Sequence, residues 1–237
     1  MVGFRIYALS EQAITIEFDQ KISTEANDRV MHLHQALSND PFPGFQESVP
    51  AYSSLTVFFD LSKIPSGYTP DTTGPIEYVS FILENRMHES IGGNPLSEQV
   101  VEIPVCYDIT LAPDLHWVSE YCRLTIPEVI KLHTGTEYRV YMIGFVPGFP
   151  YLGSLPSALE VPRKESPSLS IPAGSVALAG RQTGIYPFDI PGGWRVIGRT
   201  PLRLFDADRE PFCLLKAGMS VRFVEINISE FLQRAGS

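Results

Sequence analysis

Cysteine is scarce in this chain of 237 residues, which has three, at positions 106, 122 and 213. An odd number at wide spacing matches neither a disulfide framework nor a zinc site, so we expect a reducing compartment, the cytoplasm. No window offers about 18 consecutive apolar residues, and the N-terminus has no basic start followed by an apolar run. Neither a membrane span nor a secretion signal is therefore expected.

Basic residues are also few, with 18 Lys and Arg against 27 Asp and Glu and a formal net charge of −9. Binding to nucleic acid requires clustered Lys and Arg, so nucleic acid is not an expected partner. The chain lacks the sequence G-x-x-x-x-G-K-[ST], a G-x-G-x-x-G after a strand, H-E-x-x-H and G-x-S-x-G. These absences argue against conventional nucleotide, zinc and serine-hydrolase sites, and no metal site is predicted.

The first part of the chain has alternating strand and helix patterns. Ile14, Ile16 and Phe18 alternate with polar residues at the period of a half-buried strand, and Ser23 is placed as the N-cap of a helix. Together with a polar, glycine-containing segment at 91–98, these patterns predict an α+β domain at 1–94, a linker and a second domain at 95–237. The predicted elements are strands at 4–9 and 13–18, a helix at 24–38, strands at 45–52 and 54–60, and a helix that carries Ile76, Val79, Leu83 and Met87 and ends before Gly92.

The second part is dense in Gly, Pro and aromatic residues from Tyr138 onward. Short strands separated by turns predict a small closed or nearly closed β-barrel, with few helices after Gly135. A strand at 99–106 precedes it, and Pro104 predicts an edge position or the end of that strand. The other predicted elements are a short helix at 114–121 and a helix at 126–134, which begins with the capping-box pair Thr125 and Glu128.

Aromatic residues and arginines are mixed between positions 141 and 200. Aromatic rings with a few polar groups are typical of a small-molecule or peptide groove, and a guanidinium suits a carboxylate or phosphate. A purely structural interpretation stays open, because Gly and Pro also shape turns and aromatic residues also fill barrels. Cys122 and His133 have the chemistry of a nucleophile and its base, but nothing in the sequence places them together.

Three long runs carry a resemblance to a known family: VYMIGFVPGFPYLG at 140–153, IPAGSVALAGRQTGIYP at 171–187 and PGGWRVIGRTP at 191–201. They resemble the bacterial family of 5-oxoprolinase B subunits, also called allophanate hydrolase subunit 1, which includes an inhibitor of a sporulation histidine kinase. The likeness extends through ITIEF at 14–18 and VPAYSSLTVFFD at 49–60. It implies a small α+β N-terminal domain followed by a cyclophilin-like β-barrel.

The resemblance also implies an activity. Members of the family are expected to act with subunits A and C in the ATP-dependent opening of 5-oxo-L-proline to L-glutamate. Because this chain has no phosphate loop, we expect ATP to be bound mainly by a partner subunit or by a surface without a known motif. The alternatives are a regulatory protein that inhibits a sensor histidine kinase and a subunit of an allophanate hydrolase. Prolyl isomerase activity has less support, since fold does not determine function.

Site residues follow from the matching blocks. We expect Arg163 and Arg199 to bind an anion and His133 to be a candidate base. One position departs from the family, because its second Pro-Arg is replaced by Pro167-Ser168, which removes a charged contact of roughly 1.5–3 kcal/mol. The residues expected to bind substrate are Tyr141, Phe145, Pro147, Phe149, Tyr151, Gln182, Thr183, Tyr186, Gly192, Gly193, Trp194 and Thr200.

Overall fold

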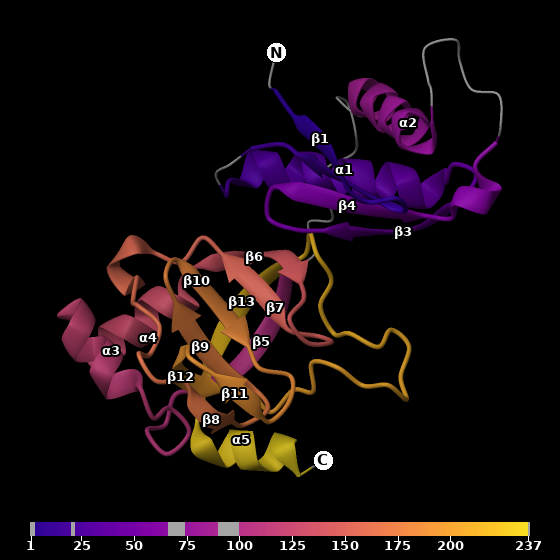
Figure 1. Cartoon of the computed structure of the whole chain (residues 1–237). Helices are drawn as coiled ribbons and strands as arrows, with labels where there is room; N and C mark the ends of the chain where they lie inside the picture. Colours follow the sequence, from indigo (N-terminus) through magenta and orange to yellow (C-terminus); the bar gives the residue numbers. More distant parts are fainter. Residues whose placement is uncertain (1–2, 20–21, 66–73, 90–99, 237) are drawn as a thin grey trace. The chain divides into compact units, whose positions relative to one another are not determined.

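The computed structural model describes residues 3–19, 22–65, 74–89 and 100–236, and its contacts divide the chain into two compact units, Met1–Leu96 and Ser97–Ser237 (Figure 1). The fold class, α+β with a closed β-barrel in the second unit, is confirmed. The predicted linker at 91–98 and the predicted boundary between residues 94 and 95 lie outside the described residues. None of the helices in the described ranges is long and apolar enough to cross a membrane.

The first unit is a four-stranded antiparallel sheet, in the order β1-β2-β4-β3, with two helices packed on it. The apolar positions predicted for 13–18 are buried, at Ile14, Ile16 and Phe18, but the predicted half-buried alternation is wrong, because Ala13 and Thr15 on the other face of β2 are buried as well. The Ser23 side chain accepts a hydrogen bond from the backbone N–H of Ala26 and starts the first helix as expected. The elements are β1 Arg5–Ser10, β2 Ala13–Glu17, α1 Thr24–Asn39, β3 Phe45–Pro50, β4 Ser54–Phe59, η1 Leu61–Lys63 and α2 Pro75–Glu89.

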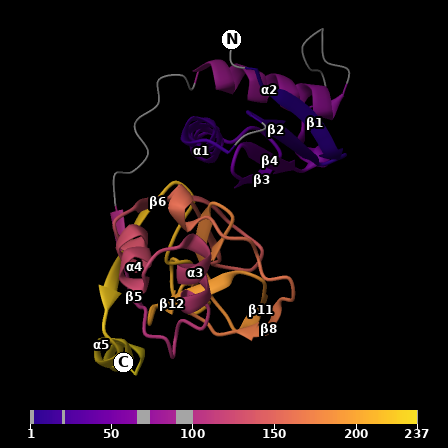
Figure 2. The ribbon, with the colours of Figure 1, turned by 90° about the vertical axis from the view of Figure 1, so that its left-hand side faces the viewer.

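The second unit is a closed barrel in the order β10-β7-β6-β13-β5-β12-β9, with a separate two-stranded sheet of β8 and β11. Figure 2 shows α3 and α4 on one side of this barrel. The capping box of Thr125 and Glu128 begins α4, as predicted. The elements are β5 Val100–Cys106, α3 Leu115–Cys122, α4 Ile126–Thr134, β6 Glu137–Ile143, β7 Pro150–Gly153, η2 Ser157–Leu159, β8 Ser168–Ile171, β9 Ser175–Ala179, β10 Gln182–Ile185, β11 Ile190–Gly192, β12 Arg195–Arg199, β13 Ser220–Ile226 and α5 Ile228–Ala235.

Strand β9 shows how the barrel separates two apolar clusters. Val176 and Leu178 belong to the main core, whereas Ala177 and Ala179 belong to a second cluster with several aromatic rings. Successive residues of a strand point to opposite faces, so the larger side chains fill one face and the small alanines leave room on the other. This arrangement provides the face on which five aromatic residues gather, namely Phe145, Phe149, Tyr151, Tyr186 and Trp194.

Of the two positions predicted for Pro104, the edge strand is wrong, whereas Pro104 does lie near the end of its strand, two residues before Cys106. Strand β5 is an inner strand of the barrel, with β13 parallel on one side and β12 on the other. Its pairing with β12 is limited to Arg199 and Cys106, so Pro104 lies outside that short ladder, where a missing N–H costs little.

Helix α5 is an element that the sequence patterns above do not predict. Asn227 and Glu230 form a capping box at its start, and Phe231 packs with Cys106 and Ile226. The spacing of Asn227 and Glu230, followed by Phe231, was a usable signal for a helix start. This helix matters because it completes a cavity described below.

Candidate functional site

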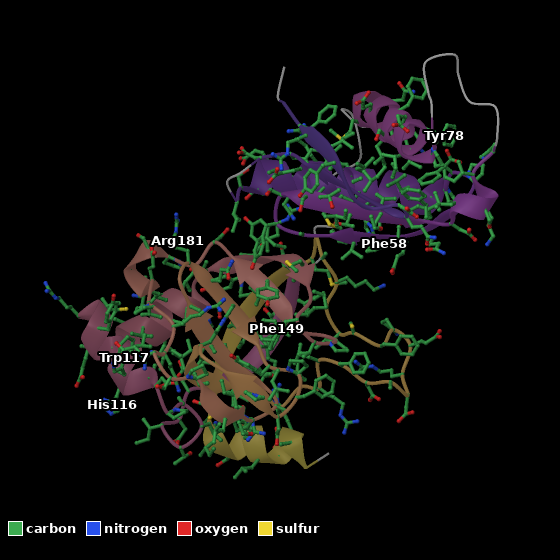
Figure 3. The ribbon with its side chains drawn as sticks, in the orientation of Figure 1. Phe58, Tyr78, His116, Trp117, Phe149 and Arg181 are labelled. Atoms are coloured by element: carbon green, nitrogen blue, oxygen red, sulfur yellow. The ribbon has the colours of Figure 1, made fainter. Side chains whose placement is uncertain are left out.

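Five aromatic residues form a cluster on the outer face of the barrel. Phe149 is its centre and is only 2% exposed (Figure 3). Figure 3 also shows Arg181, which follows Gly180 in the connection between β9 and β10. The ring centroids of Tyr151, Tyr186, Trp194 and Phe145 lie 4.9, 5.3, 5.6 and 5.9 Å from that of Phe149.

Arg163 lies beside this aromatic cluster, with its guanidinium carbon 5.9 Å from the centroid of the Trp194 ring. Burial raises the pKa of the Tyr151 and Tyr186 phenols, and the positive charge of Arg163 opposes that rise. Gly192 makes room for the phenol of Tyr186, since a Cβ at this position would overlap the phenol oxygen. The structure thus brings together the predicted arginine 163 and most of the predicted aromatic residues.

A separate cavity of about 490 Å³ contains the other predicted arginine. The Nε–H of Arg199 donates to the carbonyl oxygen of Ala173 at 2.7 Å, and its guanidinium carbon lies 5.9 Å from the centroid of the Phe231 ring. Thr200 lines the same cavity, and its backbone N–H donates to the carbonyl of Gly174. The sequence patterns did not identify several other lining residues, namely Phe188, Arg203, Phe205, Asp206 and Phe231.

The loop between β6 and β7 connects the aromatic cluster to the wall of this cavity. Phe145 and Gly148 both have positive φ values, of 70° and 79°, so the loop reverses sharply at two points. A Cβ at Gly148 would lie 2.7 Å from the Cβ of Phe205, so only glycine allows this close approach. Pro147 is exposed in the same loop, whereas Tyr141 is buried on β6, where its ring lies against Gly153.

His133 is buried and lies neither in the aromatic cluster beside Arg163 nor in the cavity at Arg199. Thr183 donates its hydroxyl hydrogen to the Ala177 carbonyl, so its oxygen accepts from Nε2 of His133 at 3.0 Å. Nδ1 is then the acceptor of the Tyr107 hydroxyl at 2.7 Å. Burial lowers the pKa of His133 to about 3, so the ring is neutral. This geometry separates His133 from the predicted anion-binding residues and gives both of its nitrogens partners other than Cys122.

The predicted site residues therefore fall into three places. His133 and Thr183 form a buried network, Arg163 lies with the aromatic cluster and Gly192, and Arg199 and Thr200 line the cavity. Gln182 is half-buried on β10, and the carbonyl of Gly193 accepts the backbone N–H of Lys164 at 2.7 Å. In the described part of the chain, no three His, Cys, Asp or Glu side chains are placed to hold a metal ion.

Comparison with known proteins identifies the family. The family model "Carboxyltransferase domain, subdomain C and D" matches residues 4–215. The 5-oxoprolinase B subunit of Bacillus subtilis (strain 168) is 43% identical over 230 residues, which are 97% of this chain and 96% of that protein. The chain belongs to the family of 5-oxoprolinase B subunits.

One further relative supports the assignment to the 5-oxoprolinase B subunits, and one solved structure shows the same fold. The 5-oxoprolinase B subunit of Escherichia coli O157:H7 is 40% identical over 220 residues, covering 93% of this chain and 95% of that protein. The crystal structure of TTHA0988 superposes with a TM-score of 0.77 at 36% identity. That match covers 91% of this chain but 40% of TTHA0988, so the present chain corresponds to a part of that longer protein.

Proposed function

We propose that this chain is the B subunit of a 5-oxoprolinase that uses ATP to open 5-oxo-L-proline to L-glutamate, together with subunits A and C. The observation that carries the proposal is the similarity over nearly the whole length to proteins named as 5-oxoprolinase B subunits in two bacteria. In this proposal the chain contributes part of the substrate site and is inactive alone.

The cavity at Arg199 supplies suitable chemistry for such a substrate. Its volume of about 490 Å³ lies within the usual range of small-ligand sites, roughly 300–1,000 Å³. Phe188, Phe205 and Phe231 give it apolar walls for a small ring. The guanidinium of Arg199 is held in place by the hydrogen bond of its Nε. In this proposal its two Nη groups bind the substrate carboxylate in a bidentate contact.

Binding of the nucleotide mainly by a partner is supported by the starts of two helices in the second unit, α4 and α5, although α3 begins at Asp114 without a side-chain cap. Helix N-termini bind phosphate through free N–H groups, but α4 and α5 both begin with a capping box. The side chains of Thr125 and Asn227 already accept the N–H groups of Glu128 and Glu230. The enclosed, neutral His133 also has no access to a substrate, so we assign the base that activates water to another subunit.

The test of the proposed function is reconstitution. The chain would be co-expressed with homologues of subunits A and C, purified as a complex and assayed for glutamate release from 5-oxoproline with and without ATP. We expect release that requires ATP and all three subunits. A well-assembled complex that releases no glutamate would overturn the proposal. Parallel assays with allophanate as substrate, and of a sensor histidine kinase with this chain added, test the two alternatives.

Replacing Arg199 in that complex is expected to lower kcat/KM for 5-oxoproline by about 10- to 100-fold, because a hydrogen bond to a charged group contributes roughly 1.5–3 kcal/mol. The change Arg199→Ala would be compared with Arg222→Ala. Arg222 is a matched control, since it is exposed on β13 and pairs with Glu137 at 3.4 Å. Thermal unfolding of both variants separates a loss of binding from a loss of folding. Unchanged kcat/KM in Arg199→Ala would exclude this role.

A further inference from the structure

A second, smaller pocket of about 150 Å³ also has Arg199 in its lining. No carboxylate side chain is among the described residues that line it. Arg199 lines both this pocket and the 490 Å³ cavity, so a group bound here would lie next to a molecule in the cavity. The polar lining consists of Thr110, Lys164, Ser168, Ser170, Ser175 and Arg199.

Strand β8 supplies two of the hydroxyl groups. Ser168 and Ser170 are two residues apart, so their side chains lie on the same face of the strand. Leu169, between them, is 92% exposed and does not line the pocket. The strand therefore contributes both serines to the pocket lining, next to the apolar Ile171, whereas Leu169 lies outside it.

Lys164 lines this pocket, and an ion pair and a hydrogen bond fix its ammonium group. Its ammonium group lies 2.8 Å from Oδ2 of Asp114 and 3.2 Å from Oγ of Ser168. The Asp114 carboxylate also accepts the backbone N–H of Val196 at 2.8 Å, and an Arg195 nitrogen lies 3.9 Å from it. Within the described residues, two of the three ammonium hydrogens of Lys164 are thus used, and one is free for a ligand.

Arg199 brings the second positive charge. Its Nε–H is fixed on the Ala173 carbonyl, and each Nη group carries two hydrogens. Within the described residues, a carboxylate bound in the cavity would use one hydrogen of each Nη group and leave the other as a donor for this pocket. Because the hydroxyl oxygen of Ser168 accepts from Lys164, its own hydrogen is also free to donate. Two cations and several hydroxyl donors around a small space are the groups that bind a tetrahedral oxyanion.

We propose that this pocket binds a phosphoryl group, held by Lys164, Arg199 and the hydroxyls of Ser168 and Ser170. A volume of about 150 Å³ equals the share of about five water molecules at roughly 30 Å³ each, which is room enough for a phosphate ion, with its one phosphorus and four oxygen atoms. The source of the group, ATP, free phosphate or a phosphorylated substrate, rests on the proposed function. The pocket itself does not, since its binding chemistry is complete in this chain.

The test measures binding of inorganic phosphate to the full chain, without partner subunits, by isothermal titration calorimetry. We expect saturable binding that weakens with salt. The variant Ser170→Asp places a negative charge in the pocket and is expected to weaken phosphate binding at least about tenfold. The variant Leu169→Asp adds the same charge at the adjacent position on the opposite face of β8, and is expected to change the affinity less than about twofold.

The outcomes separate this proposal from the enzymatic one. Lack of saturable phosphate binding, or equal weakening by Ser170→Asp and Leu169→Asp, would overturn the phosphoryl site even if the reconstituted complex releases glutamate. Conversely, selective weakening by Ser170→Asp supports the site even if that complex is inactive. Titrations with ATP and with acetyl phosphate identify the source, because the physiological one is expected to bind more tightly than inorganic phosphate. Thermal unfolding confirms that both variants are folded.

Discussion

Acidification from pH 7 to pH 5 is expected to remove about 2 kcal/mol of unfolding free energy through His133 alone. The folded state holds this ring neutral with a pKa of about 3, whereas an unfolded histidine has a pKa of about 6.5. Below pH 6.5 the unfolded chain therefore binds a proton that the folded chain excludes, and stability falls as the pH falls. The loss continues to about pH 3, where its upper limit is about 5 kcal/mol.

Urea unfolding at pH 7 and at pH 5 measures this effect. In the variant His133→Gln the difference in unfolding free energy between the two pH values is expected to be smaller by about 2 kcal/mol than in the unchanged chain. His116→Gln is the matched control, since His116 is exposed on α3. An NMR titration of the His133 ring in the unchanged chain gives a second, independent readout. A ring that becomes protonated near pH 6 while the protein stays folded would contradict the prediction.

Replacing Gly174 by alanine is expected to destabilise the second unit by about 3 kcal/mol, from two separate costs. Gly174 has a φ of +82°, where a side chain costs roughly 1–2 kcal/mol. The new Cβ would also overlap the carbonyl oxygen of Thr200, and forcing an extra carbon into a packed site costs roughly 1–3 kcal/mol. Because Gly174 and Thr200 both line the 490 Å³ cavity, this substitution also disturbs the proposed substrate site.

Gly180→Ala provides the comparison for this prediction. Gly180 also has a positive φ, of 56°, but a Cβ there would meet no atom within 4 Å. It is therefore expected to cost about 1 kcal/mol, the conformational part alone. Equilibrium unfolding in urea of the two variants measures both values. Equal destabilisation by Gly174→Ala and Gly180→Ala would show that close packing against Thr200 contributes nothing.

Local signals in the sequence predicted the elements that they determine. Each such signal lies within a few residues of the element that it marks. Examples are the helix caps at Ser23 and Thr125 and the apolar residues Ile14 and Ile16 of β2. The position of Pro104 was misjudged because its neighbours β13 and β12 come from far along the chain. A proline has no backbone N–H to donate, but this does not reveal on which side of a strand another strand will pair.

The sequence could predict which residues belong to the candidate site, but not which of them contact one another in the fold. His133 and Arg199 both match positions of the family, yet the partners of His133 are Tyr107 and Thr183, which lie 26 and 50 residues away in the chain. Burial of that kind depends on the closed barrel and has no local pattern. The approach of Phe231 to Arg199 likewise depends on where α5 packs, so neither the cavity nor the smaller pocket that shares Arg199 with it could be derived from spacing.

The position of β13 has a consequence for how this unit forms during synthesis. In the sequence, β5 is the first strand of the barrel and β13 is the last. In the barrel, β13 lies between β5 and β6, and it pairs with β5 at seven positions. A ribosome must therefore release residues 220–226 before the first strand has its main partner. Pairings so distant in sequence form slowly, and an unpaired strand edge is prone to aggregation. We therefore expect the earlier strands to remain incompletely folded until almost the entire unit has been translated.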